Sequence, residues 1–292
     1  MSKTAVTYPI VAALVAAERF LGPDRKWKPT NRKPTSGQQK RFLEQFFNIC
    51  RADNIPEIRS IASANIEEVN KFLADNGFSI RLSPLPSGSF GAASILDLLI
   101  EWIEKGEKTK VRTDDRKKFP GVRIKGENVS FYTIPGHKEP IACLKTKSGD
   151  RVFMTMLNQS PEGFDLVKKA EKLSDFDKCW EDVDEYDGIV FPMVDLNQTV
   201  DISWLEGLGT IDEKNVFWYI AQALQQTKVR MNEIGVRVQS AVAVGLMKGV
   251  MPHRPDLIIN RPFLMWIERP GLEKPLFVGY ITEEDWKNPG SL

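Results

Sequence analysis

Two cysteines and two histidines are the residues of this chain that could support nucleophilic catalysis. Cys143 and Cys179 supply thiols, and His137 and His253 supply bases. A nucleophilic thiol needs a base within hydrogen-bond reach and a third group that orients this base. No local signature surrounds either cysteine, and Pro135–His137 is typical of a turn. A Cys-dependent enzyme is therefore kept only as a third hypothesis, beside the two given below, and we do not expect an enzyme.

Charged side chains gather in two other stretches. Asp175–Asp187 holds seven carboxylates but lacks the ligand spacing and turn glycine of a calcium loop, so we interpret it as a solvated acidic face. Lys105–Lys125 holds nine Lys and Arg residues mixed with Glu and Asp. This mixture predicts an exposed mixed-charge loop, and a weak polyanion contact is the alternative. Because nucleotide-binding glycine motifs are absent too, neither a cofactor nor a metal is expected.

The most informative stretch runs from residue 232 to residue 262. After Asn232–Gly235, every second position forms one narrow face of small or β-branched residues, a pattern that predicts a strand. The residues of this face are Val236, Val238, Ser240, Val242 and Val244. Gly245–Pro255 follows with two Gly and two Pro, which indicates a long flexible loop on a strand-competent stem. An ordinary surface loop after a tight strand is the alternative interpretation.

The elements that must position this stretch change in character along the chain. Helices are predicted early, with a buried helix at Ile10–Ala17, a mostly helical Lys40–Ala74 and an amphipathic helix at Ala92–Glu104. From about residue 122 the hydrophobic period becomes that of strands, including a hairpin of Ile141–Thr146 and Arg151–Met156. Short helices are predicted at 203–208 and 216–224, and strands at 189–194, 227–231, 236–244, 263–267 and 275–281.

This order of elements contains no alternation of strand and helix. It therefore predicts an α+β fold in one domain over 1–292, with a helical part over 1–120 and a mainly β part over 121–292. The net charge of +1 argues against a nucleic-acid partner. No apolar run has the length of a membrane span, and three cysteines without a C-x-x-C motif fit a reducing compartment. We expect a cytoplasmic protein, with secretion as the alternative.

Several motifs, in this order and spacing, resemble the serpin family. Ala223–Glu233 and Gly235 resemble the strand and hinge that precede the serpin reactive-centre loop. The last serpin strands are resembled by Ile259–Ile267 and Leu276–Tyr280, and the Leu-Pro-x-Phe region by Phe191–Pro192, Asp201–Ile202 and Leu208–Gly209. The buried helix of the family is resembled by Pro9 to Gly22, and the helix that crosses its main sheet by Trp102–Glu104.

The resemblance implies a suicide-substrate inhibitor of a serine protease. A serpin fold would pack helices on antiparallel and mixed sheets and expose the loop, here around 236–255, as bait. Glu233 and Gly235 would form the hinge, and Val236–Val244 the stem that inserts into the main sheet after cleavage. The family spacing places the scissile bond at Lys248–Gly249, which implies a trypsin-like target. Met247–Lys248 is the alternative bond.

The chain departs from the family pattern at several positions. It is shorter than most serpins, so the resemblance is to a truncated member, and the strand beside which the stem would insert is not identified. Val11 replaces a Ser, and Gln225 replaces a His that supports the opening sheet. The hinge carries Val236–Val238 where inhibitors favour Thr-Glu-Ala, so insertion is expected to be slow. The second hypothesis is therefore a non-inhibitory binding or structural protein on the same scaffold.

Overall fold

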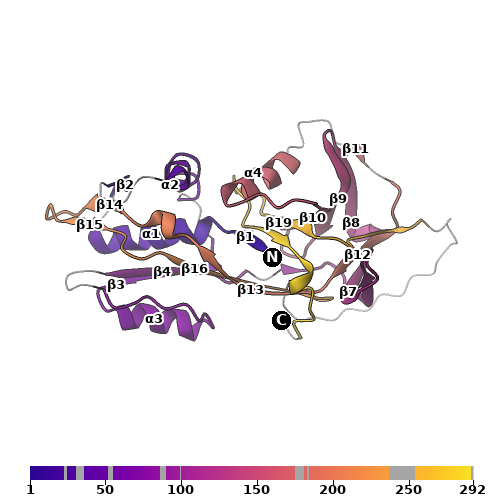
Figure 1. Cartoon of the computed structure of the whole chain (residues 1–292), viewed down its shortest axis with the longest axis horizontal. Helices are drawn as coiled ribbons and strands as arrows, with labels where there is room; N and C mark the ends of the chain where they lie inside the picture. The colour runs from indigo at the N-terminus through magenta and orange to yellow at the C-terminus, as the bar shows by residue number, and fades with distance from the viewer. Residues whose placement is uncertain are drawn as a thin grey trace. The chain divides into compact units, whose positions relative to one another are not determined.

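The chain folds into helices and several mainly antiparallel sheets (Figure 1). The computed structural model describes residues 1–292 except 23–24, 31–35, 52–54, 86–89, 99, 175–180, 183, 237–253 and 291. These residues divide into two compact units. Unit 1 contains residues 1–5, 98–196 and 228–292, and unit 2 contains residues 6–97 and 197–227. The α+β class is confirmed, whereas a single domain stays a prediction.

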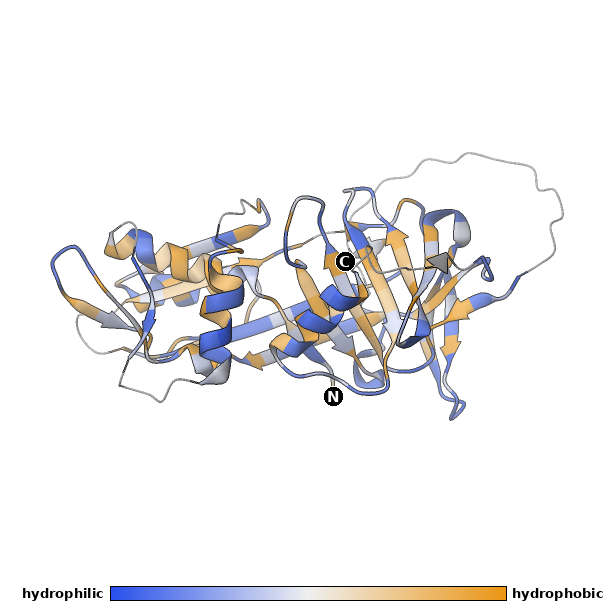
Figure 2. Cartoon of the chain, turned by 90° about the horizontal axis from the view of Figure 1, so that it is seen from above, coloured by the Kyte–Doolittle hydropathy of each residue, from blue (hydrophilic) through white to orange (hydrophobic). Residues whose placement is uncertain are grey.

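Unit 1 is built on a seven-stranded sheet with the order β1-β20-β19-β10-β9-β8-β11. Every neighbouring pair is antiparallel. Its strands carry long hydrophobic runs, drawn orange in Figure 2, and Trp266 stacks on Phe153 with ring centroids 4.9 Å apart. The helix α4 (Phe164–Leu173) contacts β1 and β20. The strands are β1 (Lys3–Ala5), β8 (Val129–Ile134), β9 (His137–Lys145), β10 (Arg151–Met156), β11 (Glu181–Asp182), β19 (Phe263–Glu268) and β20 (Phe277–Ile281).

A second sheet of unit 1 has the order β18-β12-β7-β6. Its strands are β6 (Glu107–Arg112), β7 (Lys118–Lys125), β12 (Gly188–Pro192) and β18 (Asp256–Ile258). The pairing of β18 with β12 is parallel, and the other pairings are antiparallel. Unit 1 also contains a pair formed by β5 (Ile100–Glu101) and β17 (Gly235–Val236), and single turns of 3-10 helix at 126–128 and 283–285.

Unit 2 packs helices on both faces of a two-stranded sheet. The strands β3 (Ile58–Ser63) and β4 (Gly91–Leu96) are antiparallel, with α1 (Tyr8–Leu21) on one face and α3 (Ile66–Asp75) on the other (Figure 1). The remaining elements of this unit are α2 (Gly37–Phe42), a π-helical turn (Leu43–Phe47), a 3-10 turn (Ser203–Leu205), and a sheet of β15 (Phe217–Tyr219), β14 (Leu208–Ile211) and β2 (Lys28–Pro29).

The strands β13 (Val194–Asp201) and β16 (Leu224–Met231) pair with each other, and the boundary between the units falls within both. Among the described residues, no backbone hydrogen bond joins β16 to β4. In unit 2, side-chain amides hold the backbone of residues 79–83. Gln226 Oε1 accepts from the Ser79 backbone amide (2.8 Å), Gln222 accepts from Ser83 (2.9 Å), and Asn70 accepts from Leu82 (2.8 Å). We call this arrangement the amide clasp.

Several predicted elements are correct. The buried N-terminal helix is α1, the hairpin over 141–156 is β9 and β10, and the late strands include β16, β19 and β20. Two predicted helices are wrong. Ala92–Glu104 forms most of β4 and all of β5, because alternate residues such as Ala93 and Ile95 are buried while β4 pairs with β3. Residues 216–224 contain β15, and 58–63 within the predicted early helical region form β3.

Candidate functional site: a strand hinge and its anchors

The predicted hinge is described by the structure, and most of the predicted stem and bait is not. Glu233 and Gly235 lie within the described residues, as does the backbone of Val236. The other predicted stem and bait residues are Val238, Ser240, Val242, Val244, Met247, Lys248 and Gly249, which lie outside the described residues. The site that can be examined is therefore the pair of chain segments from which the 237–253 segment leaves unit 1 and to which it returns.

The chain reverses direction directly after β16. The backbone amide of Asn232 donates to the Gly235 carbonyl (3.1 Å), and the Asn232 side chain accepts from the Ile234 amide (2.9 Å). An asparagine that binds the backbone two residues ahead stabilises a turn of this kind. The chain then forms β17, which is antiparallel to β5, with Gly235 opposite Glu101.

Asn232 is the centre of this turn. Its side chain is buried, and its amide nitrogen donates to the Gly290 carbonyl (3.0 Å). Its own carbonyl accepts a hydrogen bond from the indole Nε1 of Trp102 (3.0 Å), a residue that is itself buried. The buried groups of Asn232 and Trp102 would lose a partner if the turn opened, and an unsatisfied buried polar group costs about 1–3 kcal/mol. The turn is therefore fixed from two sides.

Glu233 attaches the hinge to the segment that follows β5. Its carbonyl accepts from the Gly106 amide (2.7 Å), and its carboxylate lies 3.1 Å from the Lys108 ammonium. The Glu233 side chain is buried, whereas 66% of the Lys108 side chain is exposed. Because solvent screens such a pair, we assign most of the attachment to the backbone hydrogen bond.

Gly235 passes so close to β5 that no side chain fits. A Cβ atom there would lie 2.4 Å from the Ile100 carbonyl oxygen and 2.7 Å from the Glu101 Cα. Its φ of +142° is also a conformation that favours glycine. The hinge glycine proposed from the sequence is therefore required by the close pairing of β17 with β5.

The chain that returns from the 237–253 segment is anchored by charged groups. Arg254 pairs with Asp184, and its backbone amide donates to the Asp187 carboxylate (2.9 Å). Two residues later, Asp256 receives a bidentate hydrogen bond from Arg123 (2.6 and 2.9 Å). This pairing raises the pKa of the Arg123 guanidinium. These contacts hold β18 beside β12, and no sequence motif singled out any of the three anchoring residues Arg123, Arg254 and Asp256.

The strand that the sequence did not predict is formed by β4 and β5, and β5 pairs with the hinge. Trp102 directly follows β5, so its assignment to a helix that crosses the main sheet is wrong. Only the repeated apolar residues over 95–102 marked this segment in the sequence, and they were mistaken for a helical stripe. Gln225, at the position of the serpin His, donates to the Val6 carbonyl (2.9 Å) within unit 2.

The stretch Lys105–Lys125 forms the β6–β7 hairpin, not an irregular loop. Several of its basic groups are paired with acids, including Lys117 with Asp115 (2.7 Å) and Lys125 with Glu107 (3.7 Å). The Lys117 hydrogen bond, assisted by one from Thr113, lowers the pKa of Asp115 to about 2. Basic and acidic side chains therefore pair with each other along this stretch, and a polyanion contact remains a prediction.

The described residues give no support to thiol catalysis. Cys143 and His137 lie on the same strand, β9, six residues apart. At a rise of about 3.3 Å per residue they are roughly 20 Å apart, too far for a proton transfer. Burial also raises the pKa of the Cys143 thiol to about 11, so it stays protonated at neutral pH. Cys179 and His253 lie outside the described residues.

Two absences concern the described residues alone. Within them, no cluster of three His, Cys, Asp or Glu side chains is arranged to hold a metal ion. Among the helices that the structure describes, none combines the length and the apolar character needed to cross a membrane.

Comparison with known proteins places this architecture in a defined class. Thyroxine-binding globulin, solved in complex with thyroxine, matches with a TM-score of 0.57 and 11% identity over 96% of this chain and 92% of its own. Tengpin, a thermophilic serpin in its native state, matches with a TM-score of 0.59 and 12% identity over 97% and 88%. Serpin48 of the insect Tenebrio molitor gives 0.51 and 12% over 94% and 96%. The chain thus has the serpin fold.

Sequence comparison supports the same class over a shorter region. Plasminogen activator inhibitor 1 of Bos taurus is 29% identical over 108 residues, which are 32% of this chain and 26% of the relative. The match thus spans about a quarter of that relative's length. A scan against protein-family profiles finds no match. Together, the fold and this relative identify a serpin-like protein, as the sequence motifs predicted.

Proposed function

We propose that this chain is a suicide-substrate inhibitor of a serine protease, with the 237–253 segment as bait. The observation that carries the proposal is the reversal at Asn232–Gly235, after which β17 runs antiparallel to β5. A stem that must enter a sheet as a new strand needs such a start, because its later residues then continue in a register that is already set. Serpin48, a "highly specific serpin", and plasminogen activator inhibitor 1 support this class of function.

In the proposed reaction, the protease serine attacks the carbonyl carbon of Lys248. The Lys248–Gly249 bond breaks, the amino group of Gly249 leaves with a proton, and Lys248 remains bound to the protease as an ester. The freed stem then adds to the sheet and carries the protease with it. A trypsin-like protease is the proposed target because lysine occupies the position before the broken bond.

The register of β17 on β5 gives the insertion a specific geometry. The backbone of Val236 is paired with Ile100, and continuing this antiparallel register along β4 would place Val242 opposite Ser94. We therefore expect a disulfide between cysteines introduced by Val242→Cys and Ser94→Cys after the loop is cut. The matched control pairs Val242→Cys with Ala93→Cys, whose side chain lies on the other face of β4. Equal cross-linking of both pairs, or of neither, would contradict this register.

The inhibitory mechanism itself is tested with trypsin. We expect a covalent complex that survives a denaturing gel, and a higher melting temperature after the loop is cleaved. Lys248→Ala should abolish the complex, Met247→Ala should leave it intact, and Lys110→Ala, an exposed change outside the loop, serves as the control. If cleavage leaves the melting temperature unchanged and no complex forms, the trapping mechanism is wrong.

The second candidate function is a binding protein that does not trap proteases. The specific observation in its favour is the hinge sequence Val236–Val238, which contains two β-branched residues and a charge where insertion calls for small neutral ones. Thyroxine-binding globulin, which this chain resembles in fold, was solved in complex with the small molecule thyroxine. Under this hypothesis the loop is cleaved as an ordinary substrate, and Lys248→Ala leaves the binding activity intact.

A further inference from the structure

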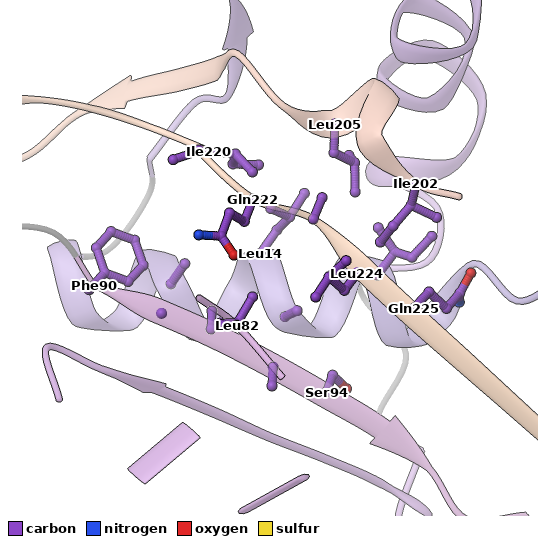
Figure 3. A pocket seen from close by; sticks show the side chains of 18 of the residues that line it. Leu14, Leu82, Phe90, Ser94, Ile202, Leu205, Ile220, Gln222, Leu224 and Gln225 are labelled. Carbon is purple, nitrogen blue, oxygen red and sulfur yellow. The ribbon is translucent and has the colours of Figure 1, made fainter. Parts of the chain in front are cut away.

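Unit 2 contains a cavity of about 270 Å³ between β4 and the chain that leads into β16. Figure 3 shows Ser94 on β4 and Gln222 and Leu224 on the facing segment around the same space. The α1 helix forms another wall, where Ala13 and Ala17 leave room that larger side chains would fill. Among the described residues, no backbone hydrogen bond joins β4 to β16 across this space.

The lining of the cavity excludes a charged ligand. Among the described residues that line it, none is Asp, Glu, Lys, Arg or His. A carboxylate or ammonium group would lose its hydration there without gaining an opposite charge, which is strongly unfavourable. The ligand must therefore be neutral and largely apolar.

Among the described residues that line the cavity, Ser94 carries the one buried side-chain polar atom without a hydrogen bond. Its hydroxyl oxygen is buried and makes no hydrogen bond to any described residue, although the great majority of buried polar atoms are paired. Ser60, directly opposite on β3, is exposed and does not line the cavity. A rotation of the Ser94 side chain into the cavity that it lines would bring this hydroxyl to a ligand hydroxyl, which would satisfy the unpaired group.

Aromatic rings form one end of the cavity. Phe90 stacks on Phe20 with ring centroids 5.1 Å apart and meets the edge of Trp218 at 5.4 Å. Both Phe90 and Trp218 line the cavity, so a planar ring can add to an aromatic group that is already assembled. The size of that ring follows from the volume. A dry cavity of about 150 Å³ holds benzene, so this cavity holds about ten non-hydrogen atoms.

We propose that this cavity is a binding site for a small neutral molecule that is mainly aromatic or aliphatic and carries one hydroxyl group for Ser94. The site does not depend on protease trapping, because it is formed by unit 2 of the uncut chain. A ligand of this kind would replace empty apolar space with contacts and give the Ser94 hydroxyl its missing hydrogen bond.

Three probes that share the naphthalene ring system test the proposal by calorimetric titration of the full, uncut chain. We expect 2-naphthol to bind about fivefold more tightly than naphthalene, because one net hydrogen bond of about 1 kcal/mol corresponds to that factor. The charged 2-naphthoate should not bind measurably. Ser94→Ala should remove the preference for 2-naphthol, whereas the matched control Ser60→Ala should keep it.

Filling the cavity provides the second arm of the test. Ala13→Phe should abolish the binding of 2-naphthol and naphthalene while the chain still unfolds cooperatively, and Ala92→Leu serves the same purpose from β4 if the first variant does not fold. Absence of 2-naphthol binding to the uncut chain would overturn the proposal. So would binding that survives both filling variants, or 2-naphthoate binding as tight as that of 2-naphthol.

Discussion

Replacing the hinge glycine, Gly235→Ala, tests the pairing of β17 with β5 most directly. The new Cβ would lie 2.4 Å from the Ile100 carbonyl oxygen and 2.9 Å from the Trp102 backbone nitrogen. All three nearest atoms belong to the backbone, so no flexible side chain can move away. We therefore expect β17 to leave β5 in this variant.

The size of the effect follows from the contacts that are lost. The Trp102 amide loses the Ile234 carbonyl and the Gly106 amide loses the Glu233 carbonyl, at about 0.5–1.5 kcal/mol each. Retaining the positive φ instead would cost about 1–2 kcal/mol for an alanine. We expect the free energy of unfolding to fall by roughly 1–3 kcal/mol, which lowers the melting temperature by about 2–4 °C per kcal/mol.

The matched control is Gly271→Ala. Gly271 also has a positive φ, of +91°, but no atom lies within 4 Å of the position that a Cβ would occupy there. This variant therefore isolates the conformational cost, and the difference between the two variants measures the contact with β5. Hydrogen exchange at the Trp102 and Gly106 amides should accelerate in Gly235→Ala alone. Equal melting temperatures for the two variants, with both amides still protected, would refute the pairing.

Three further predictions concern other side chains. Trp102→Phe removes the indole donor to the Asn232 carbonyl and should reduce the free energy of unfolding by about 1–3 kcal/mol in urea titrations. Burial lowers the pKa of His137 below 6.5, so its contribution to stability should be complete above pH 6.5 and decline as the pH falls towards the lowered pKa. His137→Gln should flatten this dependence in melting curves recorded as a function of pH. With its pKa raised to about 11, Cys143 should react with iodoacetamide at pH 8 roughly 100-fold more slowly than a free cysteine, as measured by peptide mass spectrometry.

Elements formed by residues that are close together in the sequence could be predicted from the sequence. The α1 helix shows its buried face through Ile10, Leu14 and Ala17, and the β9–β10 hairpin is marked by its short polar turn. The strand β4 was missed because its small residues give a weak alternation, while Ile95, Leu98 and Trp102 also fit a helical stripe. Its partner β3 is far from it in the sequence.

The candidate site divides in the same way. Glu233 and Gly235 were identified because the hinge motif is contiguous in the sequence. The partners of the hinge were not, because Trp102, Gly106 and Lys108 meet it only through long-range pairing. No periodicity or composition in the sequence connects two segments so far apart, and charge alone did not distinguish Arg254 from its basic neighbours.

The amide clasp on residues 79–83 has a consequence for entry to the cavity in unit 2. Ile80 and Leu82 belong both to the clasped segment and to the cavity wall. The clasp consists of carboxamides and peptide groups, which neither titrate near neutrality nor respond to ionic screening. Higher temperature or urea should therefore release residues 79–83 and allow entry to the cavity, whereas high salt and mild acid should leave the amide clasp intact.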